Sequence, residues 1–140
     1  MALASTAYLA DTTVLNRLAD PDVQAVTRPL IKDGLLRRTS ISDLEIGFSA
    51  RNAAEWDDLQ AVLRPCPVET VTASHFDAAK RTQRALADGG LRCRKVPDLL
   101  IAAVAQAAGL TVLHYDRDYD LIAEVTGQDT KWVVPPGSAD

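Results

Sequence analysis

The chain has 140 residues, of which 47% are hydrophobic and 24% are charged, with a formal net charge of −4 and a pI near 5.1. This length suits one hydrophobic core, so we expect a single domain over residues 1–140, with residues 135–140 as a frayed tail. The composition excludes a disordered protein, and the acidic charge is not that of an obvious nucleic-acid binder. Local basic patches can still have the opposite sign.

The cysteines and the termini indicate a cellular compartment. Cys66 and Cys93 lie far apart and have no partners at metal-ligand spacing, so they exclude a disulfide framework and favour a reducing environment. The first residues lack the pattern of a signal peptide, and no apolar run approaches the roughly 20 residues of a membrane span. We therefore expect a soluble, cytoplasmic protein that makes no membrane contact.

The predicted elements alternate between short apolar strands and helices. The expected strands cover residues 7–10, 35–39, 68–71, 110–113 and 132–134. The expected helices cover residues 14–18, 20–32, 42–51, 54–63, 74–87, 98–108 and 121–125. This alternation predicts an α/β fold with a mainly parallel sheet of about five strands.

Two helix starts have residues typical of caps. Thr12 and Thr13 can cap the first helix, and Ser42 with Glu45 has the spacing of a capping box, in which each side chain binds the other's backbone N–H. Pro97 suits the first turn of the helix that contains Asp98, where its missing N–H costs nothing. We therefore expect a helix to begin at Ser42.

Four acids are candidates for one site. Ligands of parallel sheets bind at the carboxyl ends of the strands. Asp11 follows the first strand, Asp116 follows the fourth, and Glu45 lies in the first turn after the second. We expect Asp98 to reach the same edge only if its helix crosses the sheet instead of running antiparallel to the strands.

Each acid alone has a simpler explanation as a turn former, a cap or a partner of the helix dipole. Several adjacent carboxylates, however, repel one another and raise one another's pKa values, and a divalent cation relieves that repulsion. Oxygen ligands favour Mg²⁺ or Mn²⁺ over Zn²⁺. Such ions can clamp a phosphate and activate water, which indicates phosphodiester hydrolysis.

Two other known motifs begin in a similar way but do not match this sequence. Asp116, Asp118 and Asp120 begin like a calcium loop, but the sixth position is Leu121 and the twelfth is Gly127. The segment that begins at Asp11 lacks the second Asp of an aspartyl phosphotransferase.

The remaining candidates are basic or aromatic. Arg92, Arg94 and Lys95 precede Asp98, and they either hold RNA phosphates or form a solvated charged loop, as do Arg81 and Arg84 on the preceding helix. We interpret His75 and His114 as structural or incidental. We interpret Trp56 and Trp132 as packing anchors.

The four acids, in this order, match a known family. The matching segments are Tyr8-Leu9-Ala10-Asp11-Thr12-Thr13, Ser42-Asp43-Leu44-Glu45, Val96-Pro97-Asp98-Leu99-Leu100-Ile101-Ala102-Ala103 and Leu113-His114-Tyr115-Asp116-Arg117-Asp118-Tyr119-Asp120. The chain resembles the PIN-domain ribonucleases, and specifically the VapC toxins of bacterial toxin–antitoxin systems. The resemblance covers nearly the whole chain.

The resemblance implies a three-layer α/β/α fold and an Mg²⁺- or Mn²⁺-dependent endoribonuclease that inhibits translation. It also implies inhibition by a VapB antitoxin and assembly as a homodimer. The implied catalytic acids are Asp11, Glu45, Asp98 and Asp116; all but Glu45 would bind metal, and Glu45 would orient or deprotonate the attacking water. Asp118 and Thr12 are possible supporting residues. His114 departs from the family, since many relatives have Thr at that position.

Two alternatives remain open. One is a non-catalytic PIN-like module whose acidic pocket binds an arginine of a partner protein. The other is a structure-specific DNA nuclease, which the small size of the chain disfavours. The sequence gives neither the RNA target nor the number of metal ions.

Overall fold

The computed structural model describes residues 6–92 and 95–140. The strands are β1 (Tyr8–Ala10), β2 (Leu36–Thr39), β3 (Val68–Glu69), β4 (Thr111–His114) and β5 (Thr130–Trp132). The helices are α1 (Thr12–Leu15), α2 (Pro21–Lys32), α3 (Ser40–Gly47), α4 (Ala53–Leu63), α5 (Ala73–Asp88), α6 (Val96–Ala108) and α7 (Asp118–Thr126). Each predicted element is present, with its ends shifted by a few residues.

The strands form one sheet in the order β3-β2-β1-β4-β5, and every neighbouring pair is parallel. The central strands β1 and β4 are in register, with Ala10 opposite Leu113. Because the chain crosses from β3 to the far side of β1 before it forms β4, the strand order reverses beside β1. Ligand sites of open α/β sheets lie at such a reversal.

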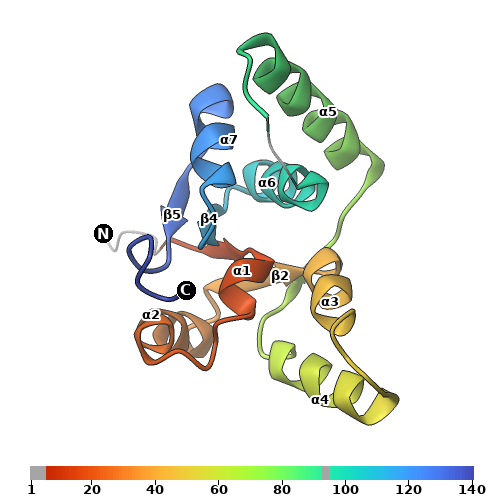
Figure 1. The fold of residues 1–140 in the computed structure, drawn as a ribbon, viewed down its shortest axis with the longest axis vertical. Coiled ribbons are helices and arrows are strands. Elements are labelled where there is room, and N and C mark those ends of the chain that lie inside the picture. The colour runs from red at the N-terminus through yellow and green to blue at the C-terminus, as the bar shows by residue number, and fades with distance from the viewer. Residues whose placement is uncertain (1–5, 93–94) are drawn as a thin grey trace, which may run out of the picture.

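Two hydrophobic cores lie on opposite faces of the sheet. Leu9 and Val112 point into the first core, which contains buried residues of α5, α6 and α7. Ala10 and Leu113 point into the second, which contains buried residues of α1, α2, α3 and α4. Figure 1 shows the two helix groups on either side of the strands. The fold is therefore the predicted three-layer α/β/α arrangement.

The most deeply buried helix, α6, is joined to β4 by a very short connection. Its buried residues include a run of small and branched side chains, Ile101 to Ala105, which permits close packing on the sheet. Gly109 ends α6 with a φ of 69°, in the left-handed region that glycine adopts without steric cost. Leu110 N donates to Ala105 O at 2.9 Å and the chain enters β4 directly.

Both predicted helix caps are wrong. The N-cap of α1 is Asp11, whose side chain accepts from Thr13 N, and not a threonine. Helix α3 begins at Ser40 with Thr39 as N-cap, so Ser42 lies inside the helix. The hydroxyl of Ser42 is buried and hydrogen-bonded to Thr12, which removes it from any capping role.

The end of the chain, which we expected to fray, is held against the body of the protein. Tyr115 Oη donates to an Asp140 carboxylate oxygen at 2.7 Å and accepts from Ala139 N at 3.0 Å. Arg17 Nε donates to Ala139 O at 2.9 Å, and the Arg17 guanidinium stacks on the Tyr115 ring. These contacts link the last residues to the turn after α1 and to the loop after β4.

The cysteines and the lengths of the helices bear on the expected cellular compartment. Cys66 is buried with a free thiol, and burial raises its pKa. Cys93 lies outside the described residues. Among the described helices, none is long and apolar enough to cross a membrane.

Candidate active site

The site lies at the carboxyl edge of the two central strands. Asp11 immediately follows β1, and its backbone N–H donates to Leu113 O at 2.9 Å. Asp116 follows the end of β4 by two residues. Because β1 and β4 are parallel and in register, both acids emerge at the same edge.

Asp98 joins this edge from the first turn of α6 and is only 3% exposed. Among the described residues, Asp98, Asp116 and Asp118 form a group whose ligand oxygens lie within 4.8 Å of one another. We expected Asp98 to reach this edge only if its helix crossed the sheet instead of running antiparallel to the strands, and that requirement was wrong. Since α6 ends where β4 begins, a helix that runs back along the sheet has its first turn at the carboxyl end of β4.

Asp11 is not a member of this group, but its charge acts on Asp98, and three donors hold its carboxylate. It is 1% exposed, and one carboxylate oxygen accepts from Tyr119 Oη at 2.6 Å. The other oxygen accepts from Thr13 N at 3.0 Å and Thr13 Oγ1 at 2.6 Å. These donors fix the Asp11 carboxylate beside Asp98, and its charge helps to raise the Asp98 pKa.

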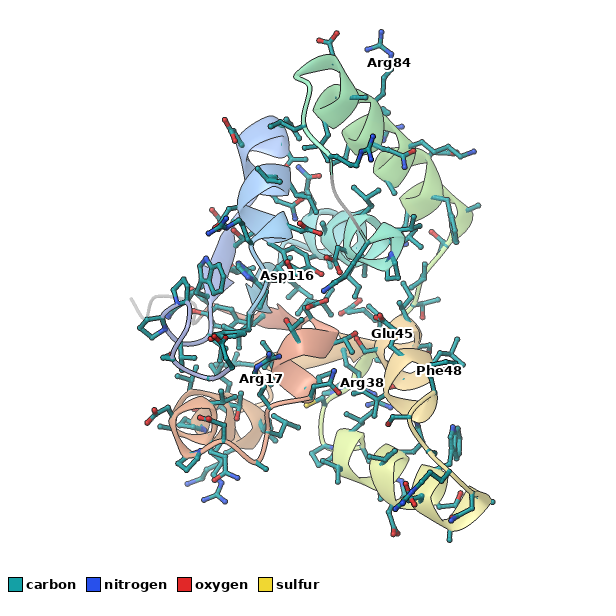
Figure 2. All side chains as sticks on the ribbon, viewed as in Figure 1. Arg17, Arg38, Glu45, Phe48, Arg84 and Asp116 are labelled. Carbon is teal, nitrogen blue, oxygen red and sulfur yellow. The ribbon has the colours of Figure 1, made fainter. Side chains whose placement is uncertain are left out.

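Glu45 lies on α3 next to Thr12, the residue after Asp11, and is held by a chain of hydroxyls. Thr12 Oγ1 donates to Glu45 Oε1 at 2.7 Å and lies 2.8 Å from Ser42 Oγ. The single Thr12 proton goes to the carboxylate, so Ser42 must donate to Thr12. This chain explains why a residue pair with capping-box spacing does not cap a helix. Figure 2 shows Glu45 on α3 and Asp116 above α1 in this view.

Asp116 is held by a charged side chain and by the backbone of its own loop. Its oxygens accept from Lys95 Nζ at 2.7 Å and from Asp118 N at 2.9 Å. Burial raises the pKa of Asp116, but these hydrogen bonds and the Lys95 charge outweigh burial and leave the pKa below its usual value. The backbone N–H of Asp116 donates to His114 Nδ1 at 3.2 Å, so the ring of His114 helps to shape this loop.

Asp98 has the opposite electrostatics. Burial, followed by the nearby charges of Asp11 and Asp116, raises its pKa to about 8. Its Oδ2 atom is buried and has no hydrogen-bond partner in the described part of the chain. A buried carboxylate oxygen without a donor is costly unless something else satisfies it. Three carboxylates and one such atom fit a hard divalent cation such as Mg²⁺ or Mn²⁺.

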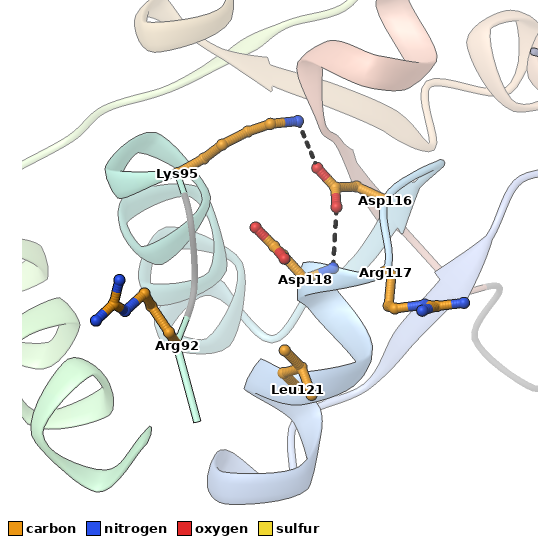
Figure 3. Close-up of a pocket in the computed structure, with 6 residues that line it drawn as sticks. All are labelled: Arg92, Lys95, Asp116, Arg117, Asp118 and Leu121. Carbon is orange, nitrogen blue, oxygen red and sulfur yellow. Dashed lines mark hydrogen bonds and ion pairs between the residues drawn. The ribbon is translucent and has the colours of Figure 1, made fainter. Parts of the chain in front are cut away.

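A pocket of about 520 Å³ opens beside these acids (Figure 3). Arg92, Lys95 and Arg117 contribute cations to its wall, and Leu121 contributes apolar surface. Arg94, the other predicted RNA contact, lies outside the described residues. Arg84 lies at the end of α5 remote from Asp116, as Figure 2 shows.

Two site residues were missed by sequence reasoning. Tyr119 is fully buried, and burial together with the charges of Asp11 and Asp98 raises its pKa well above its usual value. It therefore acts as a neutral donor to Asp11. Ser42 was assigned to a cap. Its spacing from Glu45 was the available signal, but only the fold brings it to Thr12.

The two histidines and the two tryptophans make contacts with nearby residues or lie at the surface. His75 Nδ1 accepts from Thr72 N at 2.9 Å and caps α5, and His114 is fully buried against the Tyr119 ring. These contacts agree with a structural role for both histidines. Trp132 packs on His114 and Tyr115, whereas Trp56 is 44% exposed.

Comparison with known proteins identifies the family. The PIN domain family model matches residues 8–125. The chain is 50% identical over 133 residues to ribonuclease VapC51 of Mycobacterium tuberculosis, covering 95% of this chain and 97% of that protein. It is 41% identical over 138 residues to ribonuclease VapC21 of the same species, covering 96% and 99%.

Solved structures agree on the fold. A VapBC2 structure from Rickettsia felis, bound to a DNA fragment from its promoter, has a TM-score of 0.72 at 17% identity and covers 90% of this chain and 98% of that chain. VapBC-5 from Mycobacterium tuberculosis has a TM-score of 0.63 at 23% identity, with coverages of 91% and 98%. Given the family match, the identity to curated relatives over almost their full lengths and the shared fold, the chain belongs to the PIN-domain family, among the VapC-type ribonucleases.

Proposed function

We propose that this protein is the toxin of a type II toxin–antitoxin system and that it cleaves RNA by metal-dependent hydrolysis to inhibit translation. The observation that carries the proposal is the group formed by Asp98, Asp116 and Asp118, with the buried Asp98 Oδ2 atom lacking a donor among the described residues. The curated relatives are named as ribonucleases, which supplies the substrate class.

Asp98 and Asp116 are the proposed direct metal ligands, together with Asp11. The Asp118 carboxylate, which belongs to the same group, is the supporting ligand. A bound Mg²⁺ or Mn²⁺ would supply Lewis-acid stabilisation of the charge that develops on the scissile phosphate. Tyr119 and Thr13 donate hydrogen bonds to the two Asp11 oxygens and so orient the carboxylate.

Glu45 is the proposed base. Thr12 holds its Oε1 atom, so the second oxygen is the one we assign to the attacking water, which Glu45 orients and deprotonates. That water gives a proton to Glu45 and adds to phosphorus as the bond to the leaving ribose oxygen breaks, and the leaving oxygen takes up a proton from solvent. The net reaction is hydrolysis of one phosphodiester bond.

The basic side chains that we assign to RNA are Arg92, Arg94 and Lys95. Lys95 donates to Asp116, and this hydrogen bond, together with the charges of Asp116, Asp98 and Asp11, raises the Lys95 pKa against the opposing effect of burial. Lys95 is therefore fully charged at the edge of the acids. A phosphate that enters the site would find this ammonium beside the reacting centre.

The proposed partners are a VapB-type antitoxin and a second copy of this chain. Structural neighbours include VapBC complexes, which supports the antitoxin. Helix α3 and the residue after it also expose large apolar side chains, with Phe48 92% and Leu44 73% exposed. Apolar exposure of this size is typical of protein contact surfaces.

The test is RNA cleavage by purified wild-type protein and by Asp11→Asn and Glu45→Gln, with Mn²⁺ and with EDTA. We expect wild-type cleavage only with metal, and losses of about a hundredfold or more in both variants. Far-ultraviolet circular dichroism should show that both variants keep the fold. Undiminished cleavage by Asp11→Asn would contradict the proposed mechanism.

A further inference from the structure

We propose that RNA crosses this site as an extended single strand, from the pocket beside Arg92 to a second pocket beyond Arg117, and that Arg117 binds a phosphate of that strand. This inference rests on the proposed ribonuclease function and adds the path of the substrate and a residue that contacts it. The observation that supports it is a pair of pockets that share Asp116.

The second pocket has a volume of about 360 Å³, and Arg17, Tyr115, Trp132 and Asp140 contribute to its wall. It shares Lys95, Asp116 and Arg117 with the first pocket. Since Asp116 belongs to both, the two pockets meet at this acid. A ligand that occupies both pockets passes Asp116, which is one of the proposed metal ligands.

Charge favours a polyanion along this path. The cations of the two walls are Arg92, Lys95, Arg117 and Arg17. The carboxylates of Asp116, Asp118 and Asp140 offset them in the metal-free protein, but a bound divalent cation would neutralise Asp116 and Asp118. The walls then present a net positive surface, to which successive phosphates bind.

Arg117 is the cation best placed to contact the strand beyond the acids. It is exposed, at the N-cap position of α7, between Asp116 and Asp118. Figure 3 shows its side chain extending away from the Asp118 carboxylate, on the opposite side of the pocket from Arg92. No ion pair engages its guanidinium within residues 6–92 and 95–140. It is therefore available for a phosphate.

Arg17 differs, because its guanidinium is already committed. It donates to Ala139 O and Thr13 O and stacks on Tyr115. Arg17 therefore builds the wall of the second pocket, whereas Arg117 contacts the ligand.

The pocket shapes favour a single strand over a duplex. Asp11 and Asp98 are 1% and 3% exposed, so the reacting phosphate must enter a recess. In the second pocket, the half-buried Trp132 ring is fixed by packing on His114 and by donation from Nε1 to Asp120 at 3.1 Å. A fixed aromatic ring beside cations is a platform for an unpaired base.

The test is single-turnover cleavage of a fluorescein-labelled single-stranded RNA that the wild-type protein cleaves, with protein in excess and Mn²⁺ present. The protein concentration that gives the half-maximal rate reports binding, and the maximal rate reports chemistry. Arg117→Ala and Arg92→Ala are compared with Arg84→Ala, which removes the same charge from an exposed site at the far end of α5 (Figure 2).

We expect Arg117→Ala to raise the half-maximal concentration about tenfold at low salt, as loss of one charge-assisted contact would, and to leave the maximal rate within about twofold. The slope of log affinity against log salt should become shallower by about 0.7, the value for one phosphate on a single strand. Arg92→Ala should do the same, the double variant should lose about twice that slope, and Arg84→Ala should match wild type.

Two results would overturn the strand path. One is an Arg117→Ala protein with the affinity and salt slope of Arg84→Ala while the wild type cleaves normally, which leaves the ribonuclease function standing. The other is equally fast cleavage of the same RNA annealed to its complement. If the wild type cleaves no RNA with Mn²⁺, the proposed function fails and the strand path fails with it.

Discussion

A pair of buried hydroxyls determines where Glu45 points. Thr12 Oγ1 donates to the Glu45 carboxylate and accepts from Ser42, which is fully buried. Glu45 itself lies on the exposed side of α3, so without this bond its side chain would sample several rotamers. Thr12 was predicted as a supporting residue, and this geometry specifies how it could act.

Removing the Thr12 hydroxyl therefore tests the positioning role. We expect Thr12→Val to lower the maximal cleavage rate by about tenfold to a hundredfold, because a misplaced base costs catalysis. The half-maximal RNA concentration and the Mn²⁺ affinity should change little, since Val keeps the shape and the ligands remain. Thr82→Val on α5 is the control. Equal losses in rate and in RNA affinity would indicate general damage to the fold instead.

The raised pKa of Asp98 makes the metal-free protein sensitive to pH. The pKa rises from 3.8 to about 8 on folding, so the folded protein holds a proton that the unfolded chain releases. The resulting stabilisation is fully present below pH 3.8 and is lost as pH rises through about 8. Divalent metal competes with this proton, so metal affinity should rise over the same range.

Urea unfolding in EDTA, from about pH 5 to pH 8, measures this effect. We expect the free energy of unfolding of the wild type to fall relative to that of Asp98→Asn as pH rises, because Asn cannot ionise. A difference between the two proteins that is independent of pH would show that Asp98 does not hold a proton in the folded state.

Among the secondary-structure elements, α6 and β4 form the unit that assembles the acids. The helix delivers Asp98 from its first turn, and the strand delivers Asp116 beyond its carboxyl end. The turn between them depends on Gly109, which has the left-handed conformation, and a Cβ added there would meet no atom within 4 Å. Substitution at this position would therefore cost conformational strain without a steric clash.

Gly109→Ala should lower the free energy of unfolding by about 1–2 kcal/mol, the cost of a left-handed conformation for a residue with a Cβ. Gly89→Ala is the matched control, because Gly89 has a φ of −83° and only ordinary contacts around a Cβ. Urea unfolding measures both. If both variants lose the same free energy of unfolding, the left-handed conformation of Gly109 is not the cause of the loss at that position.

The secondary-structure elements were predictable from sequence because their signals are local. Pro21 and Gly34 bracket α2, Pro97 opens α6 and Gly109 ends it, and the central strands β1 and β4 are mostly apolar. The cap at Ser42 was mispredicted because the partner of its hydroxyl is distant in sequence. Ser42 bonds to a residue 30 positions away, and no spacing rule contains that contact.

Over the whole molecule, the mainly parallel sheet and the edge at which the acids gather were also predictable, because both follow from the alternation of strands and helices, and the resemblance to PIN-domain ribonucleases implied the three layers. The role of the chain end was not, since it depends on packing against Tyr115 and Arg17, where it forms part of the second pocket. The donors around Asp11 were not predictable either, because Tyr119 reaches Asp11 across 108 positions. Contacts of this separation depend on the completed fold.

The measurement that bears most directly on the central claim is a calorimetric titration of the wild-type protein and Asp98→Asn with Mn²⁺ at neutral pH. If the protein is a metal-dependent ribonuclease, we expect saturable heat of Mn²⁺ binding with the wild type and loss of that heat with Asp98→Asn. The control is Asp88→Asn, which changes an acid at the end of α5 and should bind Mn²⁺ as the wild type does. Absence of binding by the wild-type protein, or equal binding by Asp98→Asn, would contradict the assignment of these carboxylates to a catalytic metal.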